Sequence, residues 1–179
     1  MIAVYILFSL LIIIILLGAF FILASDNFQS YLIRINEAET NIEATLSKRF
    51  DLLNKSNDII KKELNSEDDP IKIITNIRSK KMDNFELDKN LYTAIKEFHE
   101  LSEDNIEIKD NDDYTKIEIE LIDSEASILS LKKYYNDIVN KYNNLIESFP
   151  YKFVAIIKKL EQKELFIIED SMKIVNELK

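Results

Sequence analysis

The sequence predicts an all-α protein in which one N-terminal transmembrane helix continues into a long antiparallel helical bundle. The 179 residues include one glycine and two prolines, too few for the many tight turns of β architectures. Residues 2–24 carry no charge, and the rest repeats apolar residues at helical spacing. We expect a transmembrane anchor at residues 1–25 and a bundle at residues 26–179. Its three main helices should cover 26–65, 70–101 and 112–149, with a C-terminal helical segment at 151–178.

The uncharged segment 2–24 is long enough to cross a membrane, because as a helix it would measure about 34 Å against a hydrocarbon core of ~30 Å. A cleaved signal peptide is the alternative. The apolar run is longer than signal peptides have, no Lys or Arg precedes it, and Ile22 stands where cleavage before Ser25 requires a small residue. We therefore expect residues 2–24 to contact membrane lipid and the chain to be a single-pass protein of the cell membrane.

The orientation follows from basic residues. Arg34, Lys48 and Arg49 come after the apolar segment, so the positive-inside rule favours a cytoplasmic bundle.

The first bundle helix should leave the membrane without a break, since no Gly or Pro interrupts residues 19–65. Asp69 and Pro70 then fit the N-cap and first position of the second helix. Its apolar repeat lapses at residues 79–84, which predicts a kink or a short loop. A polar connector follows at 102–111.

Residues 112–149 have the strongest periodicity, and Asp112 or Asp113 could cap this helix. Pro150 ends it. A free coiled-coil dimer is an alternative, but the other segments also carry apolar stripes that need a partner, so an intramolecular bundle is favoured. Spacings of three and four form one heptad seam, made of Tyr114, Ile117, Leu121, Ser124, Ile128, Leu131, Tyr135, Ile138, Tyr142, Leu145 and Phe149.

Three alternating helices predict where the connections lie. If the first helix leaves the membrane, the second returns and the third leaves again, residues 102–111 lie near the membrane and Phe149-Pro150 lies at the far tip. The basic, amphipathic stretch 151–160 could by itself bind a membrane surface. This geometry places it away from the membrane, so packing within the bundle is the favoured interpretation.

Residues 134–150, YYNDIVNKYNNLIESFP, resemble the hallmark of the LemA family of bacterial and archaeal membrane proteins. That hallmark repeats Tyr-Asn at heptad spacing and ends in Phe-Pro. Residues 48–53 resemble the family's Arg-Arg-x-Asp-Leu-Ile. The resemblance implies a single-pass protein with a long helical bundle and no established catalytic activity. The matching residues are Arg49, Asp51, Tyr135, Asn136, Val139, Tyr142, Asn143, Ile146, Phe149 and Pro150.

The Tyr-Asn repeat also has a physical interpretation. Buried tyrosines seek a partner for the hydroxyl, and Asn beside a helical seam can fix register. Because the first and third helices are both expected to run outward, we hypothesise a polar clasp among Arg49, Asp51, Asn136 and Asn143. The functional alternative is a ligand or partner site at the tip around Phe149-Pro150.

Catalytic, cofactor-binding and metal-binding residues are not predicted. His99 is the only histidine and there is no cysteine, which removes di-iron and thiolate sites and leaves a zinc site or a triad dependent on one residue. The acidic run within 103–113 lacks the glycine of an EF-hand loop and fits a solvated connector. A net charge of −9 argues against nucleic acid as a partner.

We therefore expect a non-enzymatic scaffold or interaction module at the cytoplasmic membrane, with an unidentified protein partner and self-association left open. The alternative is a membrane-anchored helical regulator of cell division or envelope assembly that binds a filament-forming partner. An enzyme would need a pocket with perturbed titratable groups, and nothing in the sequence indicates one.

Overall fold

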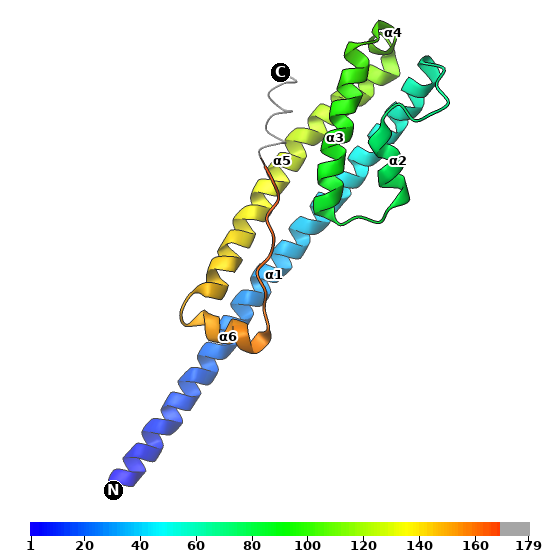
Figure 1. The fold of residues 1–179 in the computed structure, drawn as a ribbon. Coiled ribbons are helices and arrows are strands. Elements are labelled where there is room, and N and C mark those ends of the chain that lie inside the picture. The colour runs from blue at the N-terminus through cyan, green and yellow to red at the C-terminus, as the bar shows by residue number, and fades with distance from the viewer. Residues whose placement is uncertain (169–179) are drawn as a thin grey trace. The chain divides into compact units, whose positions relative to one another are not determined.

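A computed structural model describes residues 1–168 (Figure 1), and within them the chain is helical with no β-strand, as predicted. Two compact units share the chain. Of the described residues, unit 1 contains 1–37 and 136–165, and unit 2 contains 38–135 and 166–168. The helices are α1 (Ile2–Glu63), α2 (Lys72–Ser79), α3 (Asn84–Glu103), α4 (Ile106–Lys109), α5 (Asp112–Glu147) and α6 (Tyr151–Lys158).

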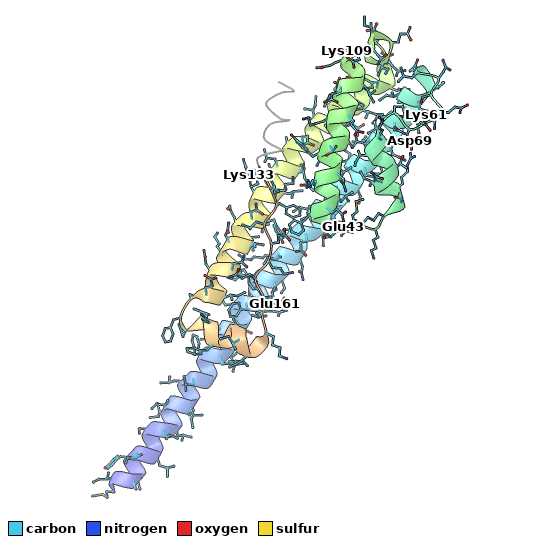
Figure 2. All side chains as sticks on the ribbon, in the orientation of Figure 1. Glu43, Lys61, Asp69, Lys109, Lys133 and Glu161 are labelled. Carbon is cyan, nitrogen blue, oxygen red and sulfur yellow. The ribbon has the colours of Figure 1, made fainter. Side chains whose placement is uncertain are left out.

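Helix α1 is one unbroken helix of 62 residues, which confirms the predicted continuity between the apolar segment and the bundle. The side chains of residues 1–19 are exposed, and Figure 2 shows side chains projecting from this part of the helix. This part is long and apolar enough to cross a membrane. Its length and composition fit a membrane anchor or a signal sequence.

The interruption predicted at residues 79–84 is a short loop, one of the two forms expected, but the chain reverses completely there, so residues 70–101 form two helices and not one returning helix. Helices α2 and α3 are antiparallel: the Ile73 amide donates to Glu97 Oε2 at 3.3 Å, and Lys80 Nζ lies 2.6 Å from Glu86 Oε1. Two lysines, Met82 and Asp83 form the reversal, and the Asp83 side chain caps α3 by accepting from the Glu86 amide. Helix α3 therefore runs in the same direction as α1.

This extra reversal inverts the direction of α5, which runs antiparallel to α1. At one end of unit 2, Asn111 Nδ2 donates to Glu63 Oε1 at 3.0 Å, and at the other, the Tyr135 hydroxyl donates to Glu39 Oε1 at 3.2 Å. The predicted parallel arrangement of these helices is wrong. The connector 102–111 lies beside the C-terminal end of α1, so its predicted place near the membrane is also wrong.

The predicted position of Phe149-Pro150 at the far tip is wrong for the same reason. In unit 1, the Tyr151 ring that follows this pair packs against Phe20 and Phe28, with centroids 5.6 and 6.2 Å apart. Phe20 belongs to the apolar segment 2–24. The end of α5 and the start of α6 therefore pack on the part of α1 where the apolar segment ends.

Two predicted helix caps are also corrected. Asn111, rather than Asp112 or Asp113, caps α5, since its Oδ1 accepts from the amides of residues 113 and 114 at 2.9 and 3.1 Å. Helix α2 begins at Lys72 with no side-chain cap, and the Asp69 carboxylate binds side chains instead.

The predicted C-terminal helix ends early. Helix α6 stops at Lys158, where the next residue, Lys159, adopts a left-handed conformation with φ 53°. Residues 160–168 have no regular secondary structure, so the predicted helix over 151–178 is wrong for this stretch, and its remainder lies outside the described residues.

The core follows the predicted heptad seam closely. Eight of its eleven positions are buried, while Leu131 and Leu145 are partly exposed and Phe149 is fully exposed. On α1 the matching stripe is buried from Phe28 to Ile60, through Ile35, Ala38, Ile42, Leu46 and Leu53. The two stripes thus meet their partners inside one chain, as the intramolecular bundle requires.

Candidate functional site

A cluster of four ionisable side chains lies in the core of unit 2. Arg49 comes from α1, Asp88 from α3, and Glu125 and Lys132 from α5, and none is more than 9% exposed. Arg49 Nη2 pairs with Glu125 Oε1, and Arg49 Nη1 lies 3.7 Å from Asp88 Oδ1. Lys132 Nζ approaches Asp88 Oδ2 at 2.6 Å. The chain of contacts joins all three long helices of the unit.

Burial acts against three of the charges in this cluster. It lowers the pKa of Arg49 and Lys132 and raises the pKa of Glu125, while the opposite charges beside each group act in the other direction. Two cations and two anions leave the cluster neutral. Of the described groups, none bonds to Arg49 Nε or Glu125 Oε2. Desolvation offsets much of the attraction between such buried charges, so the cluster by itself does not imply a large gain in stability.

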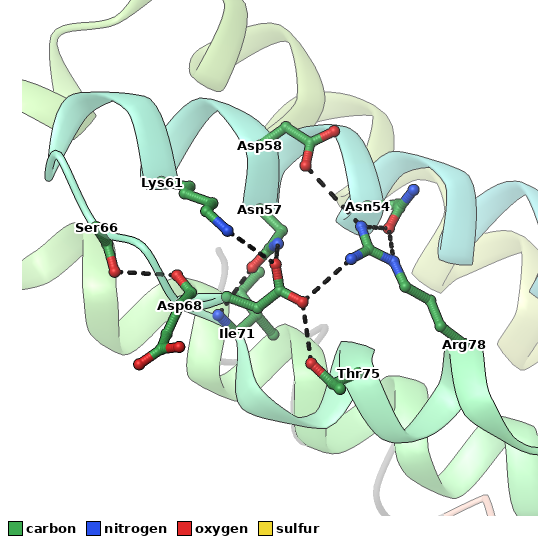
Figure 3. A network of polar contacts seen from close by, with 10 residues as sticks. Asn54, Asn57, Asp58, Lys61, Ser66, Asp68, Ile71, Thr75 and Arg78 are labelled. Atoms are coloured by element: carbon green, nitrogen blue, oxygen red, sulfur yellow. Dashed lines mark hydrogen bonds and ion pairs between the residues drawn. The ribbon is translucent and has the colours of Figure 1, made fainter.

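A second polar network joins α1 to the turn before α2 (Figure 3). Asn57, which is fully buried, donates from Nδ2 to Asp69 Oδ1 and accepts the Ile71 amide at Oδ1, both at 2.9 Å. Asp69 Oδ2 also accepts from the Thr75 hydroxyl at 2.9 Å and from Arg78 Nη1 at 3.1 Å. The bonds from Asn57 and Thr75 are the main reason that the pKa of Asp69 is lowered.

The tyrosines of the Tyr-Asn repeat are buried packing residues. Tyr142 in unit 1 meets Phe28 edge-on at 6.1 Å, and burial raises the pKa of its hydroxyl. Tyr135 in unit 2 packs edge-on against Phe166 at 5.1 Å. Phe85 in turn stacks on Phe166 at 4.2 Å, so one ring of the C-terminal stretch is held between α3 and α5.

The Asn143 side chain binds the backbone of the irregular stretch 160–168. Its Nδ2 donates to the Lys163 carbonyl and its Oδ1 accepts from the Lys163 amide, both at 2.9 Å. The amide group thereby satisfies the same donor and acceptor pair that a neighbouring β-strand would. Gln162 adds a bond from Nε2 to Glu147 Oε1 at 2.6 Å. The second Asn of the repeat therefore holds an extended segment against α5.

The predicted clasp among Arg49, Asp51, Asn136 and Asn143 is wrong in its partners. Arg49 binds Glu125 and Asp88, and Asn143 binds Lys163. The antiparallel course of α5 explains the error. Arg49 on α1 lies beside Glu125 on α5, whereas Tyr135 on α5 lies beside Glu39 on α1. Glu39 is ten residues, or about 15 Å, from Arg49 towards the N-terminus of α1.

The remaining predicted site residues fall into two groups. Val139 is fully buried, Asn136 is 9% exposed, and Ile146 and Pro150 are partly buried. Asp51 and Phe149 are exposed. The structure thus places most of the repeat on packing surfaces.

The comparison with protein families confirms the resemblance that the Tyr-Asn repeat indicated. The model of the LemA family matches residues 38–177. The chain belongs to the LemA family. The matched range includes the Arg49 cluster, the whole Tyr-Asn repeat and the stretch that Asn143 binds. No curated protein matches the sequence.

Sequence reasoning missed three members of the charged cluster in this LemA-family chain, namely Asp88, Glu125 and Lys132. A signal for two of them exists in the sequence. Glu125 and Lys132 are seven residues apart, so they share one face of α5 directly beside the seam. Asp88 has no such signal, because its burial depends on where the reversal at 80–83 directs α3.

Other potential sites of the LemA-family chain are modest. His99 is 21% exposed, with Nδ1 3.7 Å from Glu118 Oε1, and residues 1–168 contain no group of three potential metal ligands. One surface pocket of about 310 Å³ lies beside Asp51, Phe50 and Lys80. Another of about 280 Å³ lies between α1 and α5, beside Thr45, Lys48 and Asp123.

Proposed function

We propose that this LemA-family chain is a non-enzymatic scaffold or interaction module, anchored by residues 2–24 in the cytoplasmic membrane. One observation carries the proposal: a single helix, α1, bears the exposed apolar segment and continues into the core of the helical bundle. A membrane-spanning helix of this length needs no partner, because all its backbone hydrogen bonds are made within the helix. The same helix then supplies Arg49 to the buried charged cluster, which joins it to α3 and α5.

The use of the polar residues supports a non-catalytic role. Catalytic acids and bases are titratable groups that face a pocket and can reach substrate. The strongly buried ionisable groups of unit 2 instead pair with one another, and the motif residues Tyr135, Tyr142 and Asn143 hold other parts of the chain. These contacts hold the parts of the chain in fixed positions, which suits a module that presents a defined surface to another protein or to a second copy.

The structure adds an argument for the cytoplasmic orientation. Helix α6 packs on the end of the apolar segment through Tyr151 and Phe20. It thereby brings Lys152, Lys158 and Lys159 to the side of the membrane that carries Arg34. Basic residues next to a span favour the cytoplasmic side.

The absence of native cysteine permits a direct test of orientation. We expect a Glu103→Cys variant to react with a membrane-impermeant maleimide only after cells are permeabilised, because Glu103 is exposed and the bundle is cytoplasmic. Ser56→Cys is the matched control, since Ser56 is fully buried and should react only after unfolding. Labelling of Glu103→Cys in intact cells would show that the bundle faces outward.

The interaction role needs its own test. A photo-crosslinking amino acid at Ser127, in the pocket between α1 and α5, should give a discrete adduct with one protein in intact cells. The same substitution at buried Ile128 is the control and should give none. If exposed positions around unit 2 produce only diffuse, concentration-dependent adducts, the proposed interaction role is wrong.

A further inference from the structure

Helix α6 exposes a compact apolar surface that the fold leaves uncovered among the described residues. Phe153, Ile156 and Ile157 are 60, 64 and 66% exposed, and Phe149, beside Phe153 at 5.9 Å between ring centroids, is 82% exposed. The opposite face of the helix is buried through Val154 and Ala155. We call the four exposed side chains the α6 apolar face. Large apolar groups gathered in this way mark a contact with another apolar phase.

The position of this face within unit 1 identifies that phase. Tyr151, the first residue of α6, packs on Phe20 and Phe28. Phe20 lies four residues, or about 6 Å, inside the end of the segment 2–24. Ala24, between the two phenylalanines, is only 1% exposed. The start of α6 is therefore level with the boundary where the apolar segment leaves the hydrocarbon core.

Charge provides a second, independent indication. Lys152, Lys158 and Lys159 belong to α6 or adjoin its end, and all three are exposed, while residues 149–160 contain no acid. This local excess of positive charge stands out in a chain of net charge −9. Lysines beside an apolar helix face are typical of helices that lie in the headgroup region, where anionic lipids attract them.

We propose that α6 is a second membrane contact: its apolar face inserts into the surface of the same membrane that residues 2–24 cross, with the lysines bound to anionic headgroups. This inference depends on the proposed anchor, because it is the anchor that brings α6 to the lipid. The contact would hold the chain at two points, and it would make the membrane-proximal end of α5 sensitive to lipid composition.

The test uses the full chain, reconstituted in vesicles that contain phosphatidylglycerol. A single Phe153→Cys substitution carries an environment-sensitive fluorophore. We expect a blue-shifted emission and a loss of fluorescence when lipids with a spin label near the headgroup are added. Asp137→Cys is the matched control, because this exposed residue is in unit 1 but lies about 18 Å from Phe149 along α5. Its probe should stay in water and escape quenching.

A second probe separates the inference from the anchor on which it rests. Phe8→Cys lies within the apolar segment, so its fluorophore reports whether residues 2–24 are in lipid. Quenching at Phe8 without quenching at Phe153 would overturn the α6 proposal and leave the anchor intact. Loss of quenching at both positions would overturn the anchor. A blue-shifted Phe153 probe that lipid quenchers do not reach would show that protein and not lipid covers the face. That protein could be residues 169–179 or another chain, and either result would overturn the proposal.

The lysines are tested by lipid composition. In the labelled Phe153→Cys protein with no other substitution, we expect quenching to decrease when phosphatidylglycerol is replaced by phosphatidylcholine. A Lys152→Gln/Lys159→Gln variant should lose that difference, whereas Lys141→Gln, an exposed lysine on α5, should keep it. Equal quenching in both lipids for the labelled Phe153→Cys protein that keeps all its lysines would contradict the role assigned to the lysines.

Discussion

At the residue scale, Asn143 shows how a motif residue can act through the backbone of another segment. Replacing it by Ala removes both bonds to Lys163, each of which contributes about 1 kcal/mol. We expect Asn143→Ala to leave the helices folded but to speed amide exchange and proteolysis in residues 160–168. The exposed neighbour Asn144 provides the control, and Asn144→Ala should exchange like the wild type. Equal protection in both variants would show that the two bonds do not hold this stretch.

The charged cluster provides a second prediction at this scale. Arg49→Met leaves Glu125 buried without its partner and should lower the free energy of unfolding by about 3–5 kcal/mol. The double variant Arg49→Met/Glu125→Met removes both charges and keeps the Asp88–Lys132 pair neutral. Its loss in free energy of unfolding should be smaller than the summed losses of Arg49→Met and Glu125→Met by about 1 kcal/mol or more, a coupling energy typical of residues in contact. Denaturant unfolding of the four proteins measures this coupling, and additive effects would contradict the direct pairing.

These residues also show what sequence can and cannot predict. The seam and the burial of Tyr135 and Tyr142 follow from periodicity alone, because spacing determines which residues share a helix face. The partners of Arg49 and Asn143 do not follow from it. They depend on which helices run in opposite directions, and one additional reversal of the chain changes every pairing across the bundle.

At the scale of elements, that reversal occurs between α2 and α3. The apolar repeat is missing at residues 79–84, and this was sufficient to predict a break in the helix there. It could not distinguish a kink from a full turn, since both need only a few polar residues and a cap such as Asp83. Helix α2 is also short, with eight residues, and a helix of that length depends on tertiary contacts to form.

The contacts of α2 with α1 predict a pH dependence. Asn57 and Thr75 hold the pKa of Asp69 below its usual value, so the ionised carboxylate stabilises the fold above the unfolded pKa of about 3.9. This stabilisation is lost as pH falls below that value towards the folded pKa. We expect Asp69→Asn to lower stability at pH 7 and to show a smaller further loss between about pH 5 and pH 2. Chemical unfolding at several pH values measures both effects.

Asp68→Asn is the matched control for this element. Asp68 is exposed, and its carboxylate points away from the network in Figure 3. This variant should keep the wild-type dependence on pH. If Asp69→Asn also keeps it, the network contributes no measurable part of the acid sensitivity.

At the scale of the whole molecule, the sequence was sufficient to predict an all-α chain, its long first helix and its family, since composition, hydropathy and one motif determine them. It placed residues 102–111 and 149–150 at the wrong ends, because the predicted direction of each helix depended on the number of reversals before it. The error had a functional consequence. It placed the basic stretch 151–160 away from the membrane, whereas α6 packs on Phe20 at the end of the apolar segment.

The same packing bears on whether residues 2–24 remain in the mature protein. A signal peptide cleaved after Ala24 would take with it Phe20, which contacts Tyr151, and Ala24, which is buried. Helix α6 would then lose part of the surface on which it packs. We therefore expect the membrane-extracted protein to retain residues 2–24, as measured by intact mass and N-terminal sequencing. A mature N-terminus at Ser25 would instead mean that the segment only directs export, and it would contradict the anchor and the cytoplasmic bundle together.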